Sequence, residues 1–131
     1  MSVAYVDTSC LVAIALDEPG ASDVAARLAS FDRLISSNLL EAELRAAFVR
    51  ESMSGTPAEL LAEMVWVYPN RPLTPEFDRV LAVGYLRGAD LWHVACALFV
   101  APGARGLSFM TLDRPQAGIA RQLRFTVPVR A

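Results

Sequence analysis

Short strand-like segments alternate with helical segments along the whole chain. Strands are predicted at 3–7, 33–37, 107–112 and 125–129, where β-branched and aromatic residues gather, and another near 66–69 or 71–74. Periodic apolar residues predict helices at 9–16, 20–31, 39–53, from 56 onward, and at 74–87, 89–100 and 114–123. This alternation predicts an α/β fold, a three-layer α/β/α sandwich with a central, mostly parallel sheet of about five short strands.

The length and composition suit one compact unit. The 131 residues are expected to form a single domain over 1–131, and a hydrophobic share of 54% argues against disorder. No apolar run approaches the roughly 20 residues of a membrane span. Asp7 interrupts the first apolar stretch, which disfavours a signal peptide. Cys10 and Cys96 lie in apolar helical patterns and are expected to be buried thiols of a cytoplasmic protein.

The charge pattern excludes a basic nucleic-acid-binding face. There are 14 acidic and 12 basic residues, with a net charge of −2, and every basic residue is Arg. A site in which metal ions supply the positive charge remains compatible with this balance. The absence of Lys disfavours phosphoacceptor receiver domains and haloacid-type phosphatases, which place a Lys near the active aspartate. The phosphatase pattern also requires a second Asp where this chain has Ser9.

Two aspartates follow predicted strands directly. Asp7 ends the strand at 3–7, and Asp113 follows the strand at 107–112. Sites in open parallel sheets form at the carboxyl ends of the strands, so both side chains are expected at the same edge. The alternative is that each one only caps the helix that follows it, since Asp is a common N-cap residue.

Asp90 opens a nearly all-apolar helix, "ADLWHVACALFV". A carboxylate in such surroundings is costly unless it caps the helix or finds a cation, and both interpretations stay open. His93 lies one turn further on. We expect it to be a core histidine whose nitrogens are satisfied, with a metal-ligand role as the alternative. As the single His of the chain, it also argues against a zinc enzyme.

Capping residues mark two helix starts. Thr56 as N-cap, Pro57 after it and Glu59 in a capping box predict the helix from 56. Asn38 is expected to cap the helix at 39–53, which would place Glu41 in the capping box.

Glu41 therefore has a structural role that Glu43 lacks. Arg45, four residues after Glu41, adds a favourable ion pair on the helix surface. Glu43 has only apolar helical neighbours, Leu40 and Ala47, and is the spare acid. Asp7, Glu43, Asp90 and Asp113 together offer hard oxygen ligands of the kind that Mg²⁺ or Mn²⁺ prefers.

Four segments, in order, resemble the acidic motifs of PIN-domain ribonucleases: "YVDTS", "NLLEAELRAAFVR", "LRGADLWHVACAL" and "FMTLDRPQAGIA". Length and motif spacing look most like the VapC-type toxins of bacterial toxin–antitoxin modules. The resemblance implies that Asp7, Glu43, Asp90 and Asp113 bind metal and catalyse. It also implies that Ser9 supplies a supporting hydroxyl, with Thr8 beside it.

The resemblance further implies an endoribonuclease that uses one or two Mg²⁺ or Mn²⁺ ions to cleave RNA phosphodiesters. Expected partners are the RNA substrate, a cognate VapB-type antitoxin and a second copy of the chain in a homodimer. Arg groups near the motifs are candidates for the RNA backbone, or else solvated helix residues: Arg45, Arg87, Arg114 and Arg121. The alternatives are a catalytically inactive PIN domain that binds RNA or protein, and a small metal-dependent phosphatase.

Overall fold

A four-stranded parallel sheet forms the middle of the molecule. A computed structural model describes residues 1–128. The strands are β1 (Val3–Val6), β2 (Arg33–Ser37), β3 (Met64–Val67) and β4 (Leu107–Met110), in the order β3-β2-β1-β4. Val3 pairs with Arg33 on one side and with Leu107 on the other. The central position of β1 brings the residues that follow β1 and β4 together at one edge.

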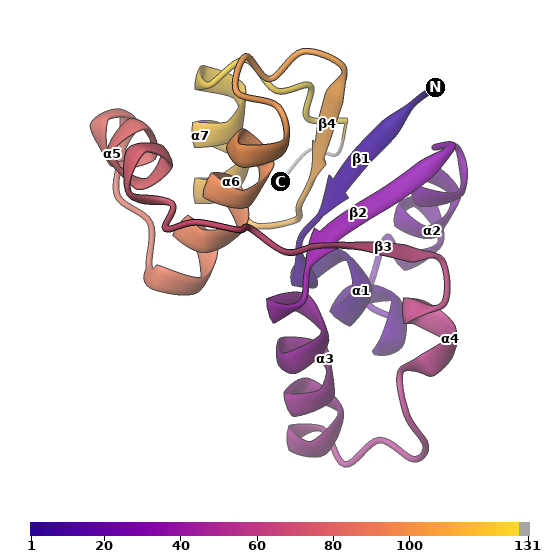
Figure 1. The fold of residues 1–131 in the computed structure, drawn as a ribbon. Coiled ribbons are helices and arrows are strands. Elements are labelled where there is room, and N and C mark those ends of the chain that lie inside the picture. The colour runs from indigo at the N-terminus through magenta and orange to yellow at the C-terminus, as the bar shows by residue number, and fades with distance from the viewer. Residues whose placement is uncertain (129–131) are drawn as a thin grey trace.

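Helices cover both faces of the sheet (Figure 1). On one face lie α1 (Thr8–Ala15), α2 (Ala21–Ala29), α3 (Leu39–Arg50) and α4 (Ala58–Leu61), and on the other α5 (Thr74–Val83), α6 (Gly88–Val100) and α7 (Arg114–Gln122). Strand side chains alternate between the two cores: Ala4 and Val6 pack on the first face, and Tyr5 on the second. The three-layer α/β/α prediction is confirmed.

Two predictions for the segment around the edge strand β3 were wrong: the length of the helix from Thr56 and the position of the strand. The helix expected from Thr56 is only the single turn of α4, which begins after Pro57 without a side-chain capping bond. Residues 64–67 form β3 instead, two residues before the first of the expected strand positions. Val65 and Trp66 pair with Ile35 and Ser36. Pairing with β2 therefore outweighs the helical pattern of this segment.

The predicted fifth strand, 125–129, is also different in the structure. Within residues 1–128 it is reduced to one parallel bridge between Ser108 and Thr126, while residue 129 lies outside the described part. Cys10 and Cys96 are buried and free, as predicted. No helix in residues 1–128 is long and apolar enough to cross a membrane.

Candidate active site

The four acids singled out in the sequence line one cavity of about 200 Å³. Asp7 comes from the end of β1, Glu43 from α3, Asp90 from the first turn of α6 and Asp113 from the residue before α7. Segments far apart in the chain therefore supply neighbouring carboxylates. The other residues that line the cavity are Thr8, Ser9, Val12, His93 and Gln116.

Asp7 is held on both carboxylate oxygens. The Ser9 hydroxyl donates to Oδ1 at 2.5 Å, and the Thr111 hydroxyl donates to Oδ2 at 2.6 Å. Gln116 Nε2 donates to the same Oδ2 at 2.8 Å. Asp7 also accepts from the backbone N–H of Ser9, so it caps α1 while it lines the cavity. The capping and site interpretations of this residue are compatible.

Asp113 also caps a helix at the cavity wall. Its carboxylate accepts from the backbone N–H of Gln116 at 2.9 Å, which confirms the cap interpretation. Asp90 makes no such bond, and α6 begins after Arg87 without a side-chain cap. Asp7, Asp90 and Asp113 nevertheless all lie at helix N-termini, where the positive end of the helix dipole favours a negative charge.

Glu43 has partners that the sequence did not reveal. The Thr8 hydroxyl donates to Oε1 at 2.6 Å, and Nε2 of the buried His93 lies 2.8 Å from the same atom. The other ring nitrogen, Nδ1, contacts the Tyr5 hydroxyl at 2.8 Å. His93 is thus a core histidine with both nitrogens satisfied, as predicted. Its Nε2 also lies 3.4 Å from the Thr8 hydroxyl, so two of its three partners, Glu43 and Thr8, line the candidate site.

The Asn38 cap and the Glu41 capping box were wrong. Asn38 makes no side-chain capping bond, and the Ser37 hydroxyl accepts from Leu39 N–H instead. The ion pair between Glu41 and Arg45 is present at 2.7 Å on the surface. Glu43, and not Glu41, is among the residues that line the cavity.

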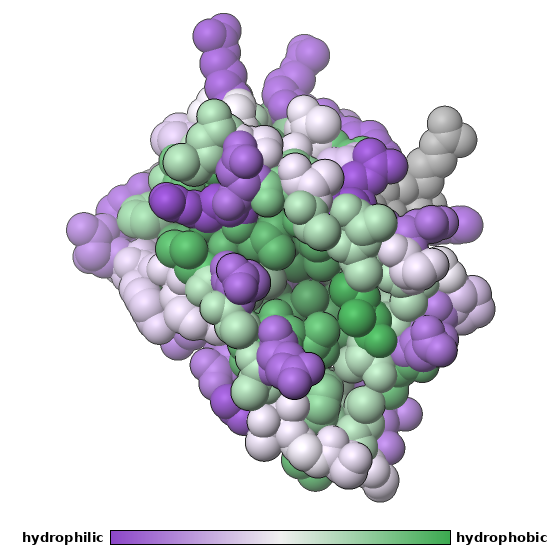
Figure 2. All heavy atoms as spheres, turned by 90° about the vertical axis from the view of Figure 1, so that its right-hand side faces the viewer, coloured by the Kyte–Doolittle hydropathy of each residue, from purple (hydrophilic) through white to green (hydrophobic). Residues whose placement is uncertain are grey.

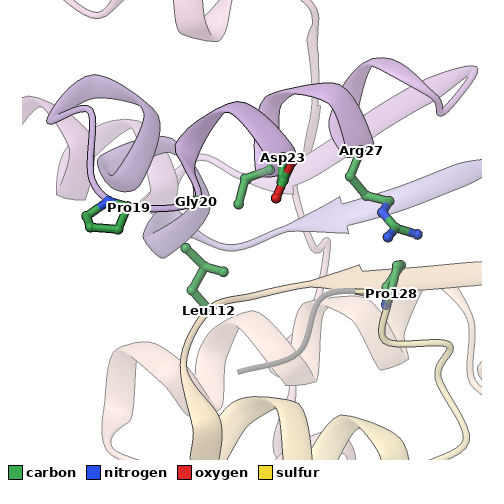
Figure 3. Close-up of a pocket in the computed structure, with 7 residues that line it drawn as sticks. Pro19, Gly20, Asp23, Arg27, Leu112 and Pro128 are labelled. Atoms are coloured by element: carbon green, nitrogen blue, oxygen red, sulfur yellow. The ribbon is translucent and has the colours of Figure 1, made fainter.

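A larger cavity, of about 410 Å³, lies elsewhere, between α2 and the segments after β4 and near residue 128 (Figure 3). Asp23 and Arg27 of α2 lie across from Leu112 and Pro128 (Figure 3). One acid and one base of opposite charge do not form a cluster of metal ligands. The candidate chemistry therefore belongs to the smaller, acid-lined cavity.

A family model for the PIN domain matches residues 4–122, a range that includes all four acids. The chain belongs to the PIN-domain family. PIN domains are generally nucleases, and those nucleases typically use divalent metal ions. No curated protein matches the chain significantly.

The acids of this PIN domain differ in their electrostatics. Burial raises the pKa of Asp7 more than its hydrogen bonds lower it. Burial, and then the negative charge of Asp113, raises the pKa of Asp90. Burial alone would raise the pKa of Glu43, but the hydrogen bonds from His93 and Thr8 outweigh it, so that pKa is lowered. Two acids thus resist carrying a negative charge, and one retains it readily.

The donor set of this PIN domain fits a hard divalent cation in its chemistry. It consists of carboxylate oxygens, which such cations prefer. Gln116 lines the same cavity, and its side-chain carbonyl oxygen Oε1 is buried without a hydrogen-bond partner. Among residues 1–128, no three Asp, Glu, His or Cys side chains are grouped so that they could hold an ion as they stand. A cation would therefore require some of these side chains to turn.

The candidate RNA-binding arginines of the PIN domain lie at different distances from the acids. Arg87 lies 3.9 Å from Asp90, and both line a second cavity of about 300 Å³ together with Asp113. Arg114 is exposed next to Asp113. Arg45, on α3, and Arg121, in the last turn of α7, do not line either cavity.

Sequence reasoning missed Thr111 and Gln116, and the role of Tyr5 and His93 in holding Glu43. Thr111 directly follows β4 and lies two residues before Asp113, which is a signal that could have been used. Gln116 is a polar residue in the first turn of α7, and only the fold shows that it contacts Asp7 and Asp90. A polar residue next to a candidate ligand is the general signal here.

Proposed function

We propose that this PIN domain is a divalent-metal-dependent endoribonuclease and the toxin of a VapBC-type toxin–antitoxin module. The observation that carries the proposal is the convergence of four acids from four distant segments on one cavity at the carboxyl edge of a parallel sheet. Carboxylates gathered in one cavity repel one another unless a cation lies among them, and this supports a metal-dependent site.

In the proposed mechanism, Asp7, Glu43, Asp90 and Asp113 hold the metal, which is one or two Mg²⁺ or Mn²⁺ ions. When bound, such ions bind the scissile phosphate, lower the pKa of a water and stabilise the leaving oxygen. Ser9 and Thr111 fix the orientation of Asp7, and Thr8 and His93 fix that of Glu43.

Arg87 is the best-placed candidate for an RNA phosphate. Its side chain is 81% exposed and it lies 3.9 Å from Asp90, a distance at which the ion pair contributes little. Its guanidinium can therefore turn to a phosphate and bind it bidentately. Arg114 extends the same edge, and Arg45 and Arg121 remain weaker candidates.

An antitoxin would require a surface that accepts an apolar partner segment. On the side that carries α2 and α4, hydrophobic residues gather in a region that hydrophilic residues border and interrupt (Figure 2). Such a region supports the partner expected for a toxin. The expected homodimer requires a second surface of the same kind.

The test is cleavage of a panel of structured RNAs by the purified protein, in Mn²⁺ or Mg²⁺ and in EDTA. We expect metal-dependent cleavage that leaves 5′-phosphate and 3′-hydroxyl ends, and no cleavage by Glu43→Gln. RNA binding without cleavage would favour an inactive PIN domain that serves as a binding module. Turnover of simple phosphate esters together with indifference to RNA would indicate a phosphatase.

A further inference from the structure

The side-chain amide of Gln116 lies between two of the four acids. Its Nε2 donates to Asp7 Oδ2 at 2.8 Å and to Asp90 Oδ1 at 3.1 Å. Both hydrogens of the amide group are therefore directed at carboxylates. One neutral side chain connects two acids whose pKa values are both raised.

The oxygen of the same amide is left without a partner. Gln116 is 2% exposed. Among the buried side-chain nitrogen and oxygen atoms of residues 1–128, its Oε1 is the one that makes no hydrogen bond. A buried carbonyl oxygen without a donor is unfavourable, because folding removes it from water without replacement. The two hydrogen bonds that the amide nitrogen donates hold the side chain in this orientation when metal is absent.

A half turn about the last side-chain bond exchanges the amide nitrogen and oxygen. Oε1 would then face Asp7 and Asp90, which repels it unless a cation lies among these oxygens. Carbonyl oxygens and carboxylates together are ligands that suit Mg²⁺ and Mn²⁺. The same side chain can therefore satisfy the acids with its nitrogen when metal is absent and bind metal with its oxygen when it is present.

We propose that Gln116 is a fifth oxygen ligand of the cation and that its amide turns when the cation binds. This inference rests on the proposed function, because it requires a cation at these acids. It differs from a purely structural role, in which the amide keeps its nitrogen toward Asp7 and Asp90 in both states.

The first test is Mn²⁺ binding, measured by calorimetry on the wild type and three variants. Gln116→Met keeps the length and burial of the side chain but removes its donor and acceptor, and Gln122→Met is the matched control at the exposed end of α7. We expect Gln116→Met to bind Mn²⁺ at least tenfold more weakly, and Gln122→Met to bind like the wild type. Gln116→Glu should bind at least threefold more tightly and melt lower in EDTA, because it adds a negative charge.

Tighter Mn²⁺ binding by Gln116→Met would overturn the proposal, since the amide would then only compete with the cation. Lack of Mn²⁺ binding by the wild type would overturn it together with the metal-dependent function. Binding to the wild type that Gln116→Met leaves unchanged would overturn the ligand role of Gln116 alone.

The second test needs no variant to fold. The chain has four side-chain amides, Asn38, Asn70, Gln116 and Gln122. In ¹⁵N-labelled wild type titrated with diamagnetic Mg²⁺, the NH₂ signals of Gln116 should move while those of Asn70 and Gln122 stay in place. If the backbone signals of Asp7 and Asp90 move and the Gln116 side chain does not, the amide does not turn and the proposal is wrong.

Discussion

Nε2 of His93 lies 2.8 Å from Oε1 of Glu43 and connects the buried core to the acid-lined cavity. The direction of this bond follows from the carboxylate, because an ionised carboxylate only accepts hydrogen bonds, so Nε2 donates to Oε1. Behind the ring, Nδ1 lies 2.8 Å from the Tyr5 hydroxyl, which accepts from Ser37 N–H. A chain of hydrogen bonds thus orients the carboxylate from inside the protein.

The choice between the two glutamates of α3 can be tested directly. Glu43→Gln should reduce RNA cleavage at least tenfold, about 1.4 kcal/mol of transition-state stabilisation, because it removes a charge proposed to bind metal. Glu41→Gln is the matched control, and it should lose only a surface ion pair worth about 0.3–0.5 kcal/mol of stability. Equal loss of cleavage in two folded variants would mean that the wrong glutamate has been assigned.

The hydrogen-bond chain behind Glu43 predicts the effect of Tyr5→Phe. The variant leaves Ser37 N–H and His93 Nδ1 buried without a partner, so the free energy of unfolding should fall by about 1–3 kcal/mol in urea denaturation. RNA cleavage should fall too, because the imidazole that contacts Glu43 loses the hydroxyl that holds its other nitrogen. Tyr68→Phe, at an exposed site, should change neither quantity. Unchanged stability of Tyr5→Phe would contradict this account of the ring.

The metal-free protein should lose stability as the pH rises. The pKa values of Asp7 and Asp90 are raised above 3.8, so each binds more protons in the folded than in the unfolded state. Their contribution is full at pH values below 3.8 and is lost as the pH rises through the raised values of the folded state. Glu43, with its lowered pKa, acts in the opposite direction at lower pH. Urea denaturation in EDTA at a series of pH values measures the sum, and saturating Mn²⁺ should reduce the decline.

Removal of one repelling charge should stabilise the metal-free fold. Asp90→Asn should melt a few degrees higher than the wild type in EDTA, because Asp113 no longer repels it and an amide oxygen can still accept from Gln116. Mn²⁺ should raise the melting temperature of the wild type by mass action and that of the variant much less. A variant that melts lower in EDTA and gains as much from Mn²⁺ would show that Asp90 is structural.

The toxin proposal predicts a phenotype. Expression of the chain alone should slow bacterial growth, and co-expression of a cognate antitoxin should restore it. Glu43→Gln should be harmless at the same protein level. Normal growth with folded, RNA-cleaving protein would refute the toxin role and leave the nuclease role intact.

The sequence predicts well what depends on local patterns. Asp7 and Asp113 follow short apolar strands, so their place at the sheet edge could be deduced from the order of elements. Glu43 was chosen over Glu41 as the candidate site residue because Glu41 forms an ion pair with Arg45 on the helix surface. The predicted capping box of Glu41, which also supported this choice, was wrong. The short strands and the helices that follow them depend on residues that are near one another in the sequence, so local patterns predict them.

What could not be predicted depends on contacts between distant segments. Residues 64–67 have a helical pattern of their own, and only the neighbouring strand β2 makes them extended. His93 meets Tyr5 across 88 positions of the sequence, and Gln116 meets Asp7 across 109. Such pairs are set by the packing of the layers, which hydrophobic periodicity does not specify.

The pairing of β1 with β4 has a consequence for biosynthesis. Val3 pairs with Leu107, which comes much later in the chain, so one side of β1 stays unpaired until β4 has been made. Asp113 and Gln116 follow only after β4. A nascent chain that ends before α7 therefore lacks part of the acid-lined cavity, and the proposed nuclease site is complete only once the segment with Asp113 and Gln116 has been made.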